Sequence, residues 1–275
     1  MTNRQPEVGA IHYPAYDAGD GEQDALLQAE LARIATPTEP DVRPVLFDVA
    51  QASHLAAVGR FIWEHAHRQR LLAVGSSSVV QGLAAHVGRS VNAAKAFSIP
   101  ALEPAAGPVL VLSGSMSPVT ARQVEAASGY ERLAADVSRL VSDSSYAGQL
   151  VERIVAGLRA QRNVLVYTAA TRGAAADSTG AQRVAQATAS LAARVVHEMA
   201  PIAPLRRVGI AGGDTSSHVA QALGLWGLSY QTTMTPGVTL SRAHSENPAL
   251  DGLELMLKGG QMGDADLFGR LVTGN

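Results

Sequence analysis

Three turns in the sequence combine glycine with serine or threonine directly after a short apolar run. They are GSSS at 75–78, SGSMS at 113–117 and GGDTS at 212–216. If each turn starts a helix, it presents unpaired N–H groups and a partial positive charge, both of which attract phosphate oxygens. Glycine lets the backbone approach such a ligand because it has no Cβ, and the hydroxyls add donors. The three turns are therefore candidate phosphate-binding sites.

Helix capping is a simpler explanation of the same residues. Ser and Thr are common N-caps, and Ser117-Pro118 reads as an N-cap with proline at the first helical position. For one turn alone, capping is favoured. Three such turns favour a ligand, since ligands of open α/β sheets lie at the carboxyl ends of strands. The sequence has no Walker A motif and no GxGxxG after a strand, so a nucleotide would be bound by a different arrangement.

A fourth glycine cluster, KGGQMGD at 258–264, lies near the C-terminus. Lys258 beside a glycine-rich loop suits an approach to a phosphate or a purine. By itself, however, the pattern favours a solvated lysine before an ordinary turn.

The elements that must position these turns follow a repeated pattern of apolar run, small-residue turn and helical period. The runs are RPVLFDVA (43–50), LLAVG (71–75), PVLVLSG (108–114), NVLVYTAA (163–170) and RRVGIAGG (206–213). Continuous apolar strands that alternate with helices predict an α/β fold, a layered parallel sheet with helices on both faces. Residues 228–252 alternate polar and apolar side chains, and LELMLKGG and DADLFGRLV follow as a strand and a short helix. We therefore expect the sheet to become mixed toward the C-terminus.

Composition restricts the function further. The 275 residues carry a formal net charge of -2, and 47% of them are hydrophobic, which argues against disorder and against nucleic-acid binding. The absence of Cys removes disulfides, thiolate nucleophiles and Cys-ligated zinc. No apolar run approaches the roughly 20 residues that a membrane-spanning helix needs. We expect a cytoplasmic protein of one large or two small domains, with SIPALEPAAG (98–107) as the predicted linker.

Taken in order, four blocks of the sequence resemble the four-carbon acid sugar kinase family. They are VLVLSGSMSPVTARQ (109–123), RVGIAGGDTSSHVAQALG (207–224), PGV (236–238) and LKGGQMGDADLF (257–268). Upstream, RPVLFDVAQASHLAAVG and LLAVGSSSVVQGLA resemble the last part of the family's substrate-binding domain. The resemblance implies a partial N-terminal, substrate-binding-type domain at 1–105 and a nucleotide-binding C-terminal domain at 106–275. Members of this family phosphorylate sugar acids such as threonate, erythronate and 3-oxo-tetronate with ATP.

The resemblance also implies roles for particular residues. Ser115 and Thr120 would support the loop structure. A role for Asp214 in positioning Mg²⁺, directly or through water, is inferred from chemistry and not from the resemblance, because hard cations take oxygen ligands; the alternative is that Asp214 only favours the helix dipole. No catalytic residue can be named. The residues implied at the ATP are Ser77, Gly212, Gly213, Asp214, Thr215 and Ser216, with Gly260 and Gly263 closing the site and Lys258 as its basic residue.

One family feature is absent: the chain has no D-D-x-T-G-type motif, so it is expected to start inside the substrate domain. His12, Tyr13, Asp17 and Asp20 are either remnants of substrate-side sequence or ordinary loop residues. The leading hypothesis is an ATP-dependent kinase of small sugar acids. The alternatives are a non-catalytic ATP-binding module or subunit, and an α/β protein whose turns are only caps. Expected partners are a sugar acid and either a second copy or a separate substrate domain.

Overall fold

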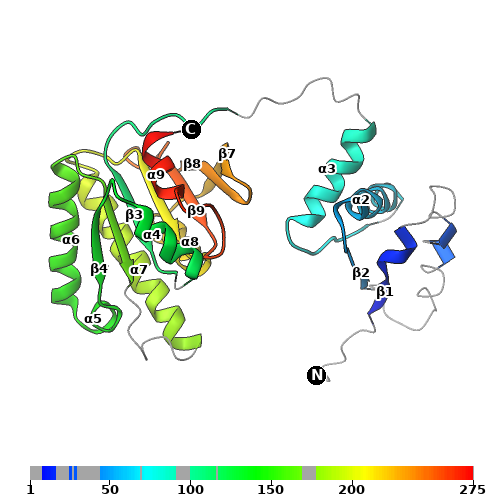
Figure 1. Ribbon diagram of the computed structural model, residues 1–275, viewed down its shortest axis with the longest axis horizontal. Helices are drawn as coiled ribbons and strands as arrows, with labels where there is room; N and C mark the ends of the chain where they lie inside the picture. Colours follow the sequence, from blue (N-terminus) through cyan, green and yellow to red (C-terminus); the bar gives the residue numbers. More distant parts are fainter. Residues whose placement is uncertain are drawn as a thin grey trace. The chain divides into compact units, whose positions relative to one another are not determined.

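The computed structural model describes residues 8–16, 25–26, 28–29, 44–68, 70–90, 100–115, 117–168 and 178–274. The chain forms two compact units, residues 1–97 and 98–275 (Figure 1).

A seven-stranded sheet forms the centre of the second unit. Its strands lie in the order β4-β5-β3-β6-β9-β8-β7; the first five are parallel, and β8 runs antiparallel to both of its neighbours, β9 and β7. The predicted α/β fold with a sheet that becomes mixed toward the C-terminus is confirmed. The strands are β3 (Val109–Ser113), β4 (Glu131–Ala135), β5 (Val164–Thr168), β6 (Arg207–Ala211), β7 (Gly227–Thr235), β8 (Val238–His244) and β9 (Glu254–Lys258).

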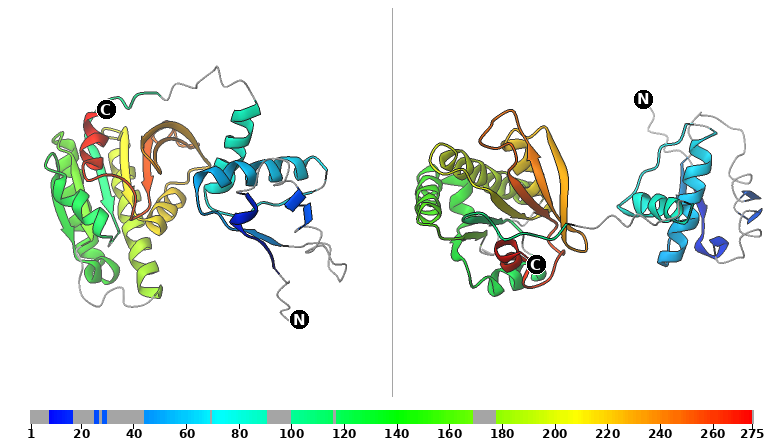
Figure 2. Two further views of the ribbon diagram at one scale, coloured as in Figure 1. Left: turned by 45° about the vertical axis from the view of Figure 1, so that its right-hand side comes forward. Right: turned by 90° about the horizontal axis from the view of Figure 1, so that it is seen from above.

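Helices cover both faces of this sheet because alternate strand residues point to opposite sides. Leu110 and Leu112 of β3 pack in the core that α5, α6, α7 and α8 cover, whereas Val109 and Val111 pack in the core that α4 and α9 cover. Figure 2 shows α4 and α9 on the side of the sheet opposite α7. The helices are α4 (Pro118–Ala126), α5 (Val137–Ser142), α6 (Ser144–Arg159), α7 (Ser178–Met199), α8 (Gly213–Ala222) and α9 (Leu267–Thr273).

Much of the segment predicted as a linker packs against the second unit. Leu102 is buried, the amide of Ala105 donates to the carbonyl of Val272 (2.9 Å), and Arg207 Nη1 donates to the carbonyl of Glu103 (2.9 Å). Residues 98 and 99 lie outside the described residues.

The first unit is smaller and has a small core. Strands β1 (Gly9–Ile11) and β2 (Val45–Phe47) form a two-stranded parallel sheet, and η1 (Tyr13–Tyr16) follows β1. Helices α2 (Ala52–Ala66) and α3 (Ser78–Ser90) cross where two glycines meet, since a Cβ on Gly59 would overlap the carbonyl of Gly82. Among the described residues of this unit, Ile11, Tyr16 and Ala57 form the buried apolar cluster.

One predicted strand of this unit is wrong. Residues 71–75, LLAVG, form no strand, and Leu72 and Val74 are 86% and 84% exposed. The apolar run predicted a buried strand, but no neighbouring strand pairs with it in the described part of the unit. Separately, none of the described helices is both long and apolar enough to cross a membrane.

Candidate functional site

The site is built where three neighbouring parallel strands end at the same level. The register aligns Ser113 of β3 with Ala211 of β6, and Ala211 with Lys258 of β9. Two hydrogen bonds continue this alignment into the turns: the amide of Gly114 donates to Ala211 (3.0 Å), and that of Gly212 donates to Lys258 (2.9 Å). The loops after β3, β6 and β9 are therefore neighbours at the carboxyl edge of the sheet.

This edge is also the point where the chain reverses its direction across the sheet. From β3 the chain passes through α4 to β4 on one side, and from β6 it passes through α8 to β7 on the other. Ligands of open α/β sheets bind at such a switch point. Of the turns predicted from sequence, 113–117, 212–216 and 258–264 come together here, whereas 75–78 belongs to the first unit.

Two of the glycines are required by the side chain of Thr215. A Cβ on Gly114 would overlap Thr215 Oγ1, and a Cβ on Gly212 would lie 3.1 Å from the same atom. Gly212 also has φ +131, a backbone conformation that favours glycine. Because Thr215 is buried and occupies this space, packing within the protein explains these two glycines without a ligand.

Gly213 differs, because a Cβ at this position would meet no atom within 4 Å. It starts α8, whose N-cap residue Gly212 makes no side-chain hydrogen bond to the helix. By contrast, α4 has its predicted cap, since Ser117 Oγ accepts from the amide of Val119 (3.2 Å). The exposed first turn of α8, with Gly213 and Asp214, thus presents N–H groups that no cap side chain satisfies.

Ser216 lies in the same turn of α8 but is enclosed. Its amide donates to the carbonyl of Gly212 (2.8 Å), and its Oγ is buried without a hydrogen-bond partner. Buried hydroxyls are usually paired. Contact between this hydroxyl and a ligand would require a local shift of the turn.

Helix α4 and strand β7 hold the loop after β9. Thr120 Oγ1 donates to the carbonyl of Gly260 (2.8 Å), Gln123 Nε2 donates to the carbonyls of Met262 (3.1 Å) and Asp264 (2.9 Å), and Thr235 Oγ1 donates to Asp264 Oδ2 (3.0 Å). The loop after β9 is therefore held by α4 on one side and by β7 on the other.

The two glycines of this loop also have structural causes. A Cβ on Gly260 would overlap Ser115 Oγ, and Gly263 has φ +87. Ser115 Oγ in turn accepts from the amide of Ser117 (3.2 Å). Ser115 therefore supports the loops, as the family resemblance implied, and Gly260 allows the close packing of the two loops.

Lys258 is buried, so the expectation of a solvated lysine is wrong. Its Nζ donates to Thr120 Oγ1 (3.0 Å) and to the carbonyl of Gly259 (3.0 Å), and only 2% of the residue is exposed. The structure shows no ion pair to it among the described residues, and burial lowers its pKa from 10.5 to about 8. The sequence did not show this because Lys258 ends a central strand that α4 covers. Its ammonium is directed at protein oxygens and joins β9, α4 and the loop.

Two polar side chains of the first unit lie at the carboxyl ends of its strands. His12 Nδ1, directly after β1, lies 3.1 Å from Asp48 Oδ2, directly after β2. Tyr13 lies in η1, whereas Asp17 and Asp20 are outside the described residues. Asp48 was not predicted, although its place directly after an apolar run could have indicated it.

Ser77 also belongs to the first unit, where it lies exposed before α3. Its Oγ accepts from Gln81 Nε2 (3.3 Å). Its proposed contact with ATP stays a prediction.

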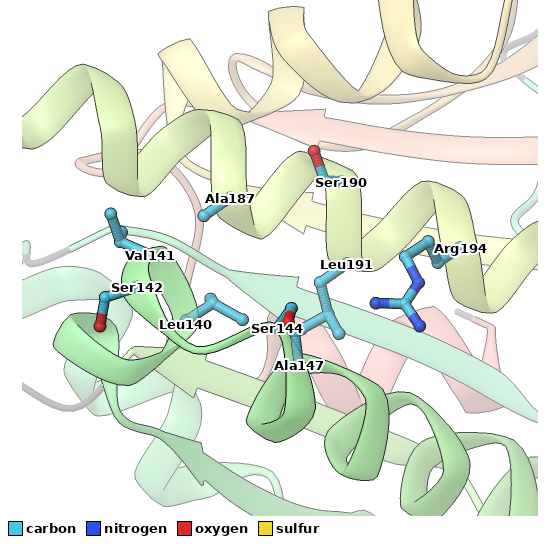
Figure 3. A pocket seen from close by; sticks show the side chains of 9 residues that line it. All are labelled: Leu140, Val141, Ser142, Ser144, Ala147, Ala187, Ser190, Leu191 and Arg194. Carbon is cyan, nitrogen blue, oxygen red and sulfur yellow. The ribbon is translucent and has the colours of Figure 1, made fainter.

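The glycine turns do not line either of two cavities of the second unit. One, of about 370 Å³, lies between α5, α6 and α7, and Figure 3 shows the guanidinium of Arg194 beside its apolar side chains. The other, of about 540 Å³, includes His197 and Trp226. In the described part of the chain, no group of three or more His, Asp or Glu residues could hold a metal ion.

Two protein-family models match the chain. A nucleotide-binding C-terminal domain matches residues 110–268, and a sugar-binding N-terminal domain matches residues 2–83. Fold and comparison together define a protein that combines these two kinds of domain. Among curated relatives, the 3-oxo-isoapionate kinase of Paraburkholderia graminis is 34% identical over 88% of this chain, and the 3-oxo-tetronate kinase of Pectobacterium atrosepticum is 32% identical over 96%. The chain belongs to the four-carbon acid sugar kinase family.

The chain spans only 54% and 60% of the length of these two relatives. Solved structures show the same fold. A Salmonella typhimurium protein aligns with TM-score 0.69 at 26% identity, covering 97% of this chain and 59% of its own. The Haemophilus influenzae protein HI1011 aligns with TM-score 0.63 at 23% identity, covering 97% of this chain and 60% of its own.

Proposed function

We propose that the second unit binds ATP at the ends of β3, β6 and β9, as the nucleotide half of a sugar acid kinase. The observation that carries this proposal is the first turn of α8, which no side chain caps and which has open space at Gly213. A helix start of this kind attracts phosphate because its N–H groups and its dipole act together. Its position at the switch point of the sheet supports the same conclusion.

The roles of the residues follow from their contacts. The exposed first turn of α8, at Gly213 and Asp214, would bind phosphate oxygens through its backbone, whereas Thr215 and Gly212 shape that turn. Lys258 would hold the loop after β9 in place through its hydrogen bond to Gly259, and its ammonium would add a positive charge near the site. Asp214 is the carboxylate available for Mg²⁺. When bound, ATP would supply the phosphoryl group and Mg²⁺ would offset its charge.

The acceptor is inferred from the relatives. Both curated relatives are kinases of small oxo sugar acids by name, so we propose the same class of substrate for the complete site. No acceptor-binding residue or catalytic base is assigned. Residues of the first unit, or a separate substrate domain, would have to hold the acceptor.

Calorimetric titration with ATP and Mg²⁺, together with thermal unfolding, tests nucleotide binding. We expect millimolar ATP to raise the melting temperature and Gly213→Val to abolish the increase, since its side chain fills the open space. Gly148→Val in α6 is the matched control, because a Cβ at Gly148 also meets nothing within 4 Å; it should retain the increase. An unchanged melting temperature of the wild-type protein, with no heat of binding, would refute the proposal.

A non-catalytic ATP-binding module is the second candidate. The observation that favours it is that the open helix start at Gly213, which carries the first proposal, suffices for ATP binding and needs no acceptor site. ADP release with 3-oxo-tetronate as acceptor distinguishes the two candidates. Turnover by the purified chain would exclude the module, and ATP binding without turnover would favour it.

A further inference from the structure

The cavity of about 370 Å³ between helices α5, α6 and α7 has a mostly apolar wall. The side chains that form the apolar part are Leu140, Val141, Ala147, Ala187 and Leu191. Leu140 and Leu191 are buried residues of the core on this face of the sheet. Because protein interiors are normally packed without gaps of this size, the space between the three helices can admit an apolar group from outside.

The same wall contains one cation. Arg194 of α7 follows Leu191 by three residues and Ala187 by seven, so the three side chains share one face of the helix. Figure 3 shows the guanidinium of Arg194 at one end of the cavity, beside Leu191, and Val141 and Ser142 at the opposite end. No Asp or Glu is among the described residues that line the cavity. The cavity is therefore apolar along its length and positive at one end.

The acidic residue between α5 and α6 does not cancel this charge. Asp143 Oδ1 accepts from the amide of Tyr146 (3.1 Å), and Asp143 Oδ2 forms an ion pair with Arg139 Nη2 (3.2 Å). Its carboxylate is thus used at the start of α6 and by a different arginine. The guanidinium of Arg194 is left to pair with a ligand.

We propose that this cavity binds a small organic monocarboxylate with an apolar chain. The carboxylate would pair with the guanidinium of Arg194, whose planar fork matches it through two parallel hydrogen bonds. The chain would lie along Leu191 and Leu140. One cation in an apolar wall favours one negative charge on an apolar body, because a second charge would lose its hydration without gaining a partner.

The size of the ligand follows from the volume of the cavity. About 370 Å³ holds roughly a dozen non-hydrogen atoms, if each takes about 30 Å³, the share of one molecule in liquid water. A carboxylate with a medium-length alkyl chain fits this space. The glycine turns do not line the cavity, so this proposal does not depend on ATP binding and the two fail separately.

Calorimetric titration of the full chain with octanoate tests the site, because octanoate carries the proposed charge and fits the volume. Acetate has the charge without the chain, and octan-1-ol has the chain without the charge. We expect each of them to bind at least about tenfold more weakly than octanoate, the scale of one charge-assisted hydrogen bond or of a few buried methylene groups. Arg194→Gln should weaken octanoate binding by a similar factor and leave octan-1-ol binding unchanged.

Arg159→Gln is the matched control, because Arg159 is an exposed arginine in the last turn of α6 that does not line the cavity. It should leave octanoate binding unchanged, and both variants should keep the wild-type circular dichroism spectrum and ATP response. Absence of octanoate binding by the wild-type protein would overturn the proposal. Equal octanoate binding by wild type and Arg194→Gln would also overturn it, since the guanidinium would then only extend into solvent over an apolar surface. Equal binding of octanoate and octan-1-ol would do the same, in favour of an unspecific apolar cleft.

Discussion

Helices α4 and α8 start at the same edge of the sheet, after adjacent strands and after similar turns, but their first turns differ. In α4 the hydroxyl of Ser117 accepts from the helix backbone, whereas in α8 the N-cap Gly212 offers no side chain. Thr215, which the sequence predicts as a ligand-binding hydroxyl, fills the space above Gly114 and Gly212. The comparison teaches that capping and ligand binding use the same residue types, and that only the contacts of each hydroxyl distinguish them.

The largest effect expected from this comparison is on stability at Gly114. Gly114→Ala places a Cβ against Thr215 Oγ1 and should lower the free energy of unfolding by about 1–3 kcal/mol, as overpacking does. Gly213→Ala adds the same methyl group in open space, and should cost nothing or gain up to about 1 kcal/mol. Urea unfolding of both variants measures the difference. Equal destabilisation would contradict the assignment of Gly114 to packing and Gly213 to the ligand.

A smaller effect should follow from Lys258, which joins the α4 side to the closing loop. Its folded-state pKa of about 8 lies below the ordinary 10.5, so the unfolded state binds more protons between these pH values. The free energy of unfolding contributed by this group therefore rises with pH across that window. We expect the free energy of unfolding of the wild-type protein to rise relative to that of Lys258→Met between pH 8 and 10.5. If Lys258 were solvated, the pH profiles of the free energy of unfolding would run parallel for the two proteins, and that result would contradict the prediction.

The smallest effect is expected at the cap of α4. Ser117→Ala removes the bond to the amide of Val119 and should lower the free energy of unfolding by about 1 kcal/mol, the usual value for a cap. The increase in melting temperature with ATP should be unchanged, because this hydroxyl is used inside the helix. Loss of the ATP response in Ser117→Ala would mean that both helix starts belong to the nucleotide site.

Most strands of the second unit could be predicted because they are continuous apolar runs in a buried sheet. Strand β4 was missed: it lies at the sheet edge, and in ERLAA only Leu133 and Ala135 are buried. The run at 71–75 was predicted as a strand for the same reason that the others were, but an apolar pattern does not guarantee a partner. Among the described residues, strand prediction therefore succeeded where a neighbouring strand pairs with the apolar run.

The site could be predicted only as a set of turns. Their meeting at one edge follows from the parallel topology, which the alternation of strands and helices indicated. The contacts of Thr215 with Gly114, and of Lys258 with Thr120, join positions far apart in the sequence. No local pattern in the sequence contains these contacts. Some residues that were predicted to bind a ligand therefore have contacts that packing explains.

The first residues of β6 and β9 determine the position of the turns that follow the other ends of these strands. Arg207 and Glu254 are paired in register and form an ion pair of 2.6 Å, and Arg207 Nη1 also donates to the carbonyls of Glu103 and Leu271 (2.9 Å each). A slip of one residue would move the start of α8 by about 3.3 Å, the rise of a parallel strand, and would leave the buried guanidinium without its acceptors. The contacts of Arg207 at the far end of the sheet thus fix the position of the first turn of α8 at the other end.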